Sequence, residues 1–271
     1  MSSGRDWSDD ESFAAGVSRD TVAASSDAHL QLRYSLAPLV VLDTPIVPES
    51  GRHPEDAALA GHGFARAERL PGNVGLVEIR QFYPARISGH VAAAAMTLVA
   101  DTDVLLIDLR RCPGGEPDMV TLVESCLFDE RTQLNSIHFP AEDRTVQWWT
   151  DPFASGARFG GVKPLYVLIS SESYSAAEGF SYDLQQAGRA TLVGERTPTG
   201  VAYFDYRYRV SDHLMFSVPS GHIVNPVSGR GWAPDGVQPD IQVAASRVWT
   251  SRMRWLSSMC SRWVTQADAR A

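Results

Sequence analysis

Cysteine is scarce in this chain of 271 residues, which contains only Cys112, Cys126 and Cys260. Their number is odd, they are widely spaced, and no Cys-x-x-Cys pair occurs, which argues against a disulfide scaffold and against a cysteine-based zinc site. Cysteine used so sparingly fits a reducing compartment, so we predict a cytoplasmic protein. We predict neither a metal ion nor another cofactor.

Long apolar stretches and an excess of positive charge are also missing. No run of 18 apolar residues occurs, and the first residues, MSSGRDWSDDES, are polar and acidic, so we expect no transmembrane helix, no secretory signal and no membrane partner. The formal charge is −8, from 24 basic and 32 acidic residues, which argues against a nucleic-acid partner. Only one of the basic residues, Lys163, is a lysine.

The composition is that of an ordinary globular protein, with 44% hydrophobic and 21% charged residues. A chain of this length holds one large domain and a small appendage. We expect a polar N-terminal segment with a short helix over 1–26, a main domain over 27–245 and an amphipathic C-terminal helix over 246–271. The apolar stripe of this last helix favours a core-facing seam, with a homo-oligomer contact as the alternative; it consists of Trp249, Met253, Leu256, Cys260 and Trp263.

Within the main domain, short apolar strands alternate with helices, which is typical of βαβ units. We therefore predict an α/β fold with a mostly parallel sheet. The segment 203–224 alternates aromatic and polar residues and predicts an antiparallel hairpin, 29–41 predicts another strand, and 43–62 an exposed loop. The other expected strands are 72–82, 104–110, 164–170 and 189–195, and the expected helices are 87–100, 117–128 and 175–188.

Two strand-to-helix junctions are candidate sites, because ligands of open α/β sheets bind beyond the carboxyl ends of the strands, where helix N-termini offer free N–H groups. The first junction is DLRRCPGGEPDM at 108–119. Its Gly114 and Gly115 allow positive φ and a close approach of the backbone to a ligand. A tight turn that serves only chain reversal is the alternative interpretation.

The second junction is LISSESYSAAEGF at 168–180. A serine on such a sharp turn projects its hydroxyl above the sheet, and the N–H groups that follow it can bind an oxyanion. The alternative is that Ser173 or Ser175 only caps the helix, with Glu178 three residues after Ser175 completing a capping box.

A serine nucleophile needs a base. Lys163 stands at the opposite end of the 164–170 strand from Ser175, about 20 Å away at about 3.3 Å per residue, which excludes a serine–lysine dyad. Among the seven histidines, His29 follows Asp27 immediately before a strand, from where a side chain can reach a sheet edge. Spacing alone does not select it.

Three runs of sequence resemble the tail-specific, or C-terminal-processing, serine peptidases. The runs are VLLIDLRRCPGG, YVLISSESYSAAEGFSYDLQQAGRATLVGERTPTG and NPVSGRGWAPDGVQPDIQV, and the resemblance extends from about Asp27 to Val243. It is strongest to the lysine-free branch, which includes the interphotoreceptor retinoid-binding protein repeats and resembles the tricorn core protease; Gly200 stands where the other branch has its lysine. The resemblance implies a ClpP/crotonase-like ββα core.

This resemblance also implies roles for individual residues. Ser175 matches the nucleophile and His29 matches the base, while the N–H groups of Gly114 or Gly115 and of Ala176 match the oxyanion hole.

The sequence departs from the family pattern at three positions. Cys112 stands where the family usually has asparagine, Ala28 replaces a serine before the histidine, and Ala233 replaces a glutamate before Gly236 and Val237. A base histidine needs a partner that fixes its tautomer. Asp235 and Asp27 are the candidates for that role.

The sequence thus predicts a serine hydrolase of peptidase type that cleaves an amide or ester bond of a peptide or small acyl substrate. The rival is a non-catalytic module that binds an apolar ligand or a peptide terminus in the same cleft, which the two alanines favour. Acyl transfer or cyclisation is a third possibility. The candidate pocket residues, which core packing would also explain, are Trp148, Trp149, Tyr203 and Phe204.

Overall fold

The computed structural model describes residues 9–25, 30–39, 54–198, 203–232 and 234–244. Its centre is a six-stranded sheet with the order β11-β8-β7-β4-β3-β2, in which the strands from β11 to β3 run parallel and β2 pairs antiparallel with β3. The predicted α/β fold with a mostly parallel sheet is therefore confirmed. The strands are β2 (Phe64–Leu70), β3 (Val74–Ile79), β4 (Val104–Asp108), β7 (Leu165–Ile169), β8 (Thr191–Gly194) and β11 (Ile241–Gln242).

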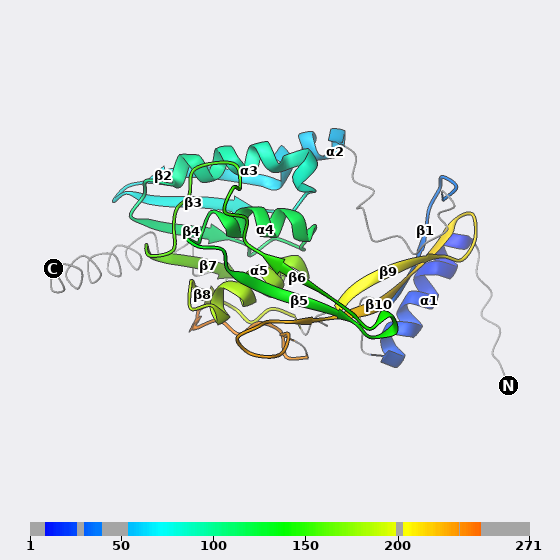
Figure 1. The fold of residues 1–271 in the computed structure, drawn as a ribbon. Helices are drawn as coiled ribbons and strands as arrows, with labels where there is room; N and C mark the ends of the chain where they lie inside the picture. Colours follow the sequence, from blue (N-terminus) through cyan, green and yellow to red (C-terminus); the bar gives the residue numbers. More distant parts are fainter. Residues whose placement is uncertain (1–8, 26–29, 40–53, 199–202, 233, 245–271) are drawn as a thin grey trace.

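Three helices cover one face of this larger sheet: α3 (Ala85–Val99), α4 (Pro117–Ser125) and α5 (Ala176–Gln186) (Figure 1). Every residue of β4 and of β7 is buried, as expected for central parallel strands. Met96 of α3 and Phe180 of α5 pack in the same core as Ile107 of β4 and Val167 of β7. Because β4 and β7 are parallel, both candidate junctions start from the same edge of the sheet.

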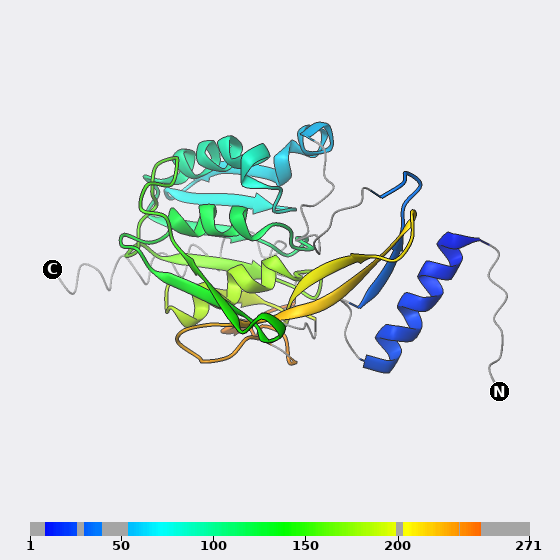
Figure 2. The same cartoon turned by 45° about the vertical axis from the view of Figure 1, so that its right-hand side comes forward.

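A smaller antiparallel sheet lies beyond the helices, and its long central strand β10 pairs with β1, β5 and β9. Leu134 of β5 joins the core beneath α5. The other half of this sheet, with α1 packed on β1, projects from the body (Figures 1 and 2). These elements are α1 (Asp10–Ser25), β1 (Gln31–Tyr34), β5 (Gln133–Phe139), β6 (Arg144–Trp149), β9 (Tyr203–Arg209) and β10 (Leu214–Val224), with a short helix η2 (Pro140–Glu142) between β5 and β6.

The structure corrects two local expectations. Of the strand predicted over 29–41, the described part, residues 30–39, forms a strand only at β1, four residues long. The loop predicted over 43–62 is wrong where the structure describes it, because α2 (Pro54–Leu59) and η1 (Gly61–Gly63) occupy its end. A proline at the first helical position and acidic residues in the first turn both favour a helix start at PEDAAL.

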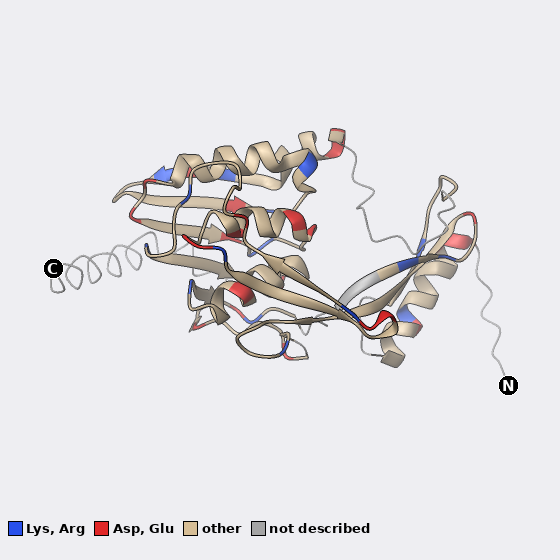
Figure 3. Ribbon diagram, viewed as in Figure 1, with Lys and Arg blue, Asp and Glu red and all other residues tan. Residues whose placement is uncertain are grey.

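Acidic and basic positions are mixed over the described elements, and basic ones lie on β9 in the projecting part (Figure 3). Among the described helices, none has the length and apolar character needed to cross a membrane. The predicted C-terminal helix, with its core or oligomer contact, lies outside the described residues, and the division at 26 and 245 stays a prediction.

Candidate active site

Ser175 lies immediately before α5, on the turn that follows β7, with φ 55° and ψ −117°. A helix-capping residue ordinarily has an extended backbone, and a positive φ costs a residue other than glycine about 1–3 kcal/mol. The capping-box pair with Glu178 is present, but capping alone does not require this conformation. The strained turn therefore favours the interpretation of Ser175 as a presented nucleophile.

Gly114 of the first junction packs directly against this turn, and Gly115 packs against the backbone of Phe82. Gly114 has φ 102°, and a Cβ on it would lie 2.9 Å from the Cβ of Ser175 and 2.8 Å from the amide nitrogen of Ala176. Gly115 has φ 142°, and a Cβ there would lie 2.0 Å from the carbonyl oxygen of Phe82. Only glycine fits either position, so the pair serves a close approach between two backbones as well as a chain reversal.

The peptide group between Gly114 and Gly115 is held from one side. Its carbonyl oxygen accepts hydrogen bonds from the N–H of Phe82 at 3.0 Å and from Nε2 of Gln81 at 2.5 Å. In a trans peptide the N–H points the opposite way, so the N–H of Gly115 faces away from Phe82. Within the described residues neither this N–H nor that of Ala176 has an acceptor, which leaves both available for an oxyanion.

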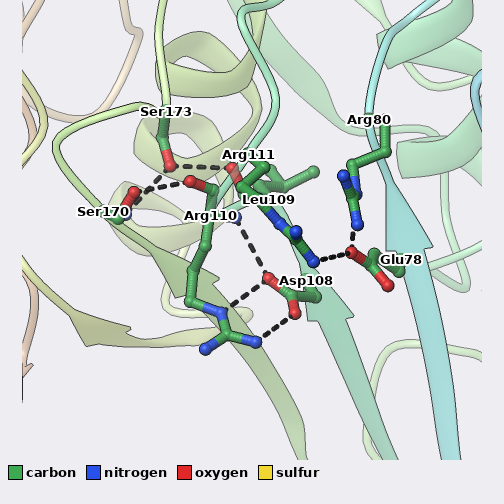
Figure 4. Close-up of polar contacts among 8 residues, drawn as sticks. All are labelled: Glu78, Arg80, Asp108, Leu109, Arg110, Arg111, Ser170 and Ser173. Carbon is green, nitrogen blue, oxygen red and sulfur yellow. Dashed lines mark hydrogen bonds and ion pairs between the residues drawn. The ribbon is translucent and has the colours of Figure 1, made fainter. Parts of the chain in front are cut away.

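Two serines of the second junction, Ser170 and Ser173, donate hydrogen bonds to the backbone of the first junction (Figure 4). The hydroxyl of Ser173 donates to the carbonyl oxygen of Leu109 at 2.8 Å, and the hydroxyl of Ser170 donates to that of Arg110 at 2.5 Å. The N–H of Ser170 in turn donates to the hydroxyl of Ser173 at 2.9 Å. Ser173 is completely buried and joins the two loops, so the alternative interpretation of Ser173 as the helix cap is wrong.

Ion pairs fix the ends of β3 and β4 beside the glycine loop (Figure 4). The guanidinium of Arg110 contacts both carboxylate oxygens of Asp108, at 2.9 and 2.6 Å, and this hydrogen bonding raises the pKa of Arg110. Glu78 binds both Arg80, at 2.6 Å, and the more exposed Arg111, at 3.1 Å. These contacts explain the charged residues of the DLRR motif as supports of the loop.

A buried carboxyl group lies under the Ser175 turn. Oε2 of Glu178 accepts the N–H of Ser175 at 2.8 Å, and Oε1 accepts the hydroxyl of Thr197 at 2.7 Å. The oxygen of that hydroxyl accepts the N–H of Val237 at 2.8 Å. Burial raises the pKa of Glu178 to about 7, while the hydrogen bonds act in the opposite direction. Gly236 of the same loop has φ 70° and packs closely on Thr197. A Cβ on this glycine would lie 2.6 Å from the carbonyl oxygen of Thr197, which is too close for any larger residue.

The structure therefore joins four of the predicted site residues, namely Ser175, Ala176, Gly114 and Gly115. His29, Asp27, Ala28, Gly200 and Ala233 lie outside the described residues, so their roles stay predictions. Asp235 is described and exposed, next to the Gly236 turn.

The pocket role of Trp148, Trp149, Tyr203 and Phe204 stays a prediction, and the side chains of Tyr203 and Phe204 lie outside the description. Trp149 lies on β6, where Arg131 stacks on its ring at 4.3 Å and its indole N–H donates to Gln147 at 3.3 Å. The indole N–H of Trp148 is buried without an acceptor in the described part of the chain. The backbone of Tyr203 pairs with His222.

Lys163 precedes β7, whereas Ser175 follows its carboxyl end, so the strand separates them as expected. The ammonium group of Lys163 binds the carbonyl oxygen of Ala100 and lies 4.2 Å from the centre of the Phe159 ring. Three supports of the two junctions were not predicted from sequence: Gln81 at the Gly114 carbonyl, Ser173 as a link between the loops, and Thr197. Of these three residues, only Ser173 had a signal in the sequence, because it lies in the serine-rich run SSESYS.

The model of peptidase family S41 matches residues 73–243, more than half of the chain. Solved structures with a similar fold include a candidate peptidase from Parabacteroides merdae, with a TM-score of 0.62 at 15% identity, covering 94% of this chain and 84% of that one. A candidate S41 protease from Bacteroides fragilis has a TM-score of 0.60 at 18% identity, covering 68% and 51%. The photosystem II D1 C-terminal processing protease has a TM-score of 0.51 at 22% identity, covering 67% and 46%.

These likenesses concern the fold. This chain spans about half the length of the Bacteroides fragilis protein and less than half that of the D1 processing protease, so both contain substantial parts without a counterpart here.

Proposed function

Because this chain belongs to peptidase family S41, a family of serine peptidases, we propose that it cleaves an amide or ester bond through an acyl-enzyme on Ser175. The observation that carries the proposal is the Ser175 turn. A serine at positive φ stands at the start of a helix, beside a glycine that no larger residue could replace and beside backbone N–H groups with no acceptor among the described residues.

In the proposed reaction, the imidazole of His29 takes the proton of the Ser175 hydroxyl as the oxygen attacks the substrate carbonyl carbon. The N–H groups of Gly115 or Gly114 and of Ala176 bind the resulting oxyanion. The tetrahedral intermediate collapses, and the leaving amine or alcohol takes the proton from the imidazolium. Water then attacks the acyl ester with His29 as base again, which releases the acid and restores the serine. The role of His29 rests on the resemblance in sequence.

The finer features of the proposal come from the sequence. We propose a peptide or small acyl substrate, a cytoplasmic location, a ClpP/crotonase-like core and Asp235 as a candidate partner of the histidine. The alanines at 28 and 233 favour one second candidate, a member that binds its ligand without turnover.

Labelling with a fluorophosphonate probe tests the proposal. We expect the wild type to be labelled, Ser175→Ala to lose labelling completely, and His29→Ala to be labelled at least about 100-fold more slowly, because the serine then lacks its base. Ser171→Ala is the matched control, since Ser171 is an exposed serine of the same turn and should label like the wild type. Absence of labelling in folded wild-type protein would refute the proposal in favour of the binding module.

A further inference from the structure

The conformation of Ser175 must be maintained by its surroundings, because its φ is unfavourable for a residue with a side chain. On the helix side, the carbonyl oxygen of Ser175 accepts the N–H groups of Glu178 at 2.9 Å and Gly179 at 3.0 Å, as at many helix starts. On the other side, the N–H of Ser175 is bound by the Glu178 carboxyl group. The same peptide is also held at the carbonyl oxygen of Tyr174, which accepts the N–H of Ala177 at 3.1 Å. The Glu178 side chain is therefore the side-chain contact among those that orient the peptide entering Ser175.

The Glu178 side chain is itself locked in place. It is 1% exposed, and the Thr197 hydroxyl holds its second oxygen. Thr197 is tied to the loop at Val237 by three contacts: its hydroxyl oxygen accepts the N–H of Val237, its own N–H donates to the carbonyl oxygen of Val237 at 3.1 Å, and Gly236 packs against it. Three segments that are distant in sequence thus converge on one carboxyl group beneath the serine.

We propose that Glu178 is a positioning residue of the serine centre: through the N–H of Ser175 it holds the turn in which the serine hydroxyl and the N–H of Ala176 have their working orientation. This inference rests on the proposed role of Ser175 as nucleophile. Glu178 takes no part in proton transfer to the substrate and acts only through the backbone of Ser175.

The charge of Glu178 matters for this role, because a hydrogen bond to a carboxylate is stronger than one to a neutral acid. The Glu178 carboxyl accepts hydrogen bonds from the Ser175 N–H at the start of its own helix and from the Thr197 hydroxyl of the segment after β8. The indole of Trp232, from the loop after β10, also faces it, but the indole N–H has no hydrogen-bond partner among the described residues. Among the described residues no charged side chain perturbs it. With a pKa of about 7, Glu178 is ionised above neutral pH. Below neutral pH it is protonated, and its hydrogen bond with the Ser175 N–H is weaker.

The rate of fluorophosphonate labelling tests the role of Glu178 when its charge is removed. In Glu178→Gln the new side chain has the size of the old one and can keep both contacts. Its amide oxygen accepts the Ser175 N–H, and its amide nitrogen donates to the Thr197 hydroxyl oxygen. We expect kinact at pH 8 to fall about fivefold with KI unchanged, the difference between a charged and a neutral acceptor. Glu124→Gln is the matched control, since Glu124 is also a buried glutamate but lies at the end of α4, and it should label like the wild type.

The pH profile of kinact tests the ionisation of Glu178. Thr197→Val removes a hydrogen bond that lowers the pKa of Glu178, so the lower limb of the profile should move to higher pH. Thr197→Ser keeps the hydroxyl and should leave the profile in place. If Glu178→Gln labels at the wild-type rate with an unchanged profile while Ser175→Ala is not labelled, the positioning role is refuted and the nucleophile stands.

The backbone contact has a readout that needs no activity. In two-dimensional ¹H–¹⁵N NMR, the amide proton of residue 175 should shift with a midpoint near pH 7 in the wild type and in Ser175→Ala, and should not shift in Glu178→Gln. A flat wild-type titration would overturn the inference. If the wild type is never labelled but this titration is seen, the proposed function fails while the hold on the turn is established.

Discussion

Two glutamates lie buried in the helical layer of this protein, and burial raises the pKa of both, yet their surroundings differ completely. Glu178 at the start of α5 has a hydrogen-bond donor on each oxygen. Glu124 at the end of α4 is fully buried, and neither of its oxygens has a partner in the described part of the chain. A buried carboxyl group with partners can organise a reactive turn, whereas one without partners costs stability.

The region around Glu124 is also where the helices meet the smaller sheet. Asp183 of α5 accepts hydrogen bonds from Asn135 at 2.6 Å and from Asn225 at 2.9 Å, and burial raises its pKa to about 7. The charge of Asp183 raises the pKa of Glu124 further. The unfavourable feature of this region is the burial of two neighbouring carboxyl groups, Glu124 and Asp183. The unfavourable feature of the Ser175 region is a backbone conformation, the positive φ of Ser175. The following variants test that contrast.

The largest effect is expected from Gly114→Ala. The added methyl group would clash with the Cβ of Ser175 and the amide of Ala176, so it should displace an oxyanion donor and slow probe labelling about 100-fold or more. Gly188→Ala is the control, because Gly188 also has positive φ, 64°, but a Cβ there meets no atom within 4 Å. Equal labelling of the two variants would mean that the Gly114 contact is not part of the site.

A smaller effect, on stability, is expected from Glu124→Met. Removing a buried polar group without partners should raise the free energy of unfolding by about 1–3 kcal/mol at pH 8, as measured by urea denaturation. Since the pKa of Glu124 is higher in the folded than in the unfolded protein, its contribution is most favourable at pH values below its unfolded pKa and is lost as the pH rises through the folded pKa.

The gain from Glu124→Met should therefore be smaller at pH 5 than at pH 8. Glu124→Gln removes the titration but leaves a buried amide in place, so it should flatten the difference between the two pH values with less overall gain. A wild type that is more stable than Glu124→Met at pH 8 would show that Glu124 has a favourable partner after all.

The smallest effect is expected from Arg111→Ala, which removes an exposed ion pair with Glu78. The Arg111 side chain is 58% exposed, so the loss should change the free energy of unfolding by less than about 0.5 kcal/mol. Arg110→Ala should lower the free energy of unfolding more than Arg111→Ala, as measured by thermal denaturation of both variants. The reason is that the Arg110 side chain is only 15% exposed and contacts both oxygens of Asp108. Equal melting temperatures of the two variants would show that burial does not determine how much these ion pairs contribute to stability.

Much of the larger sheet could be predicted from sequence, because strands buried on both faces, such as β4 and β7, appear as continuous apolar runs. The strands β5 and β6 escaped prediction, since few of their residues are buried and their alternation is weak. The glycine pair and Ser175 were found from their places at strand ends. The positive φ of Ser175 and the contact between Thr197 and Val237, forty residues apart, depend on tertiary packing that no local pattern records.

The site of covalent modification is the most direct test of the account. After reaction of folded wild-type protein with a fluorophosphonate, digestion and mass spectrometry of the peptides should place one phosphonyl group on Ser175. Modification of another serine, with Ser175 unmodified, would contradict the assignment of the turn before α5 as the reactive centre.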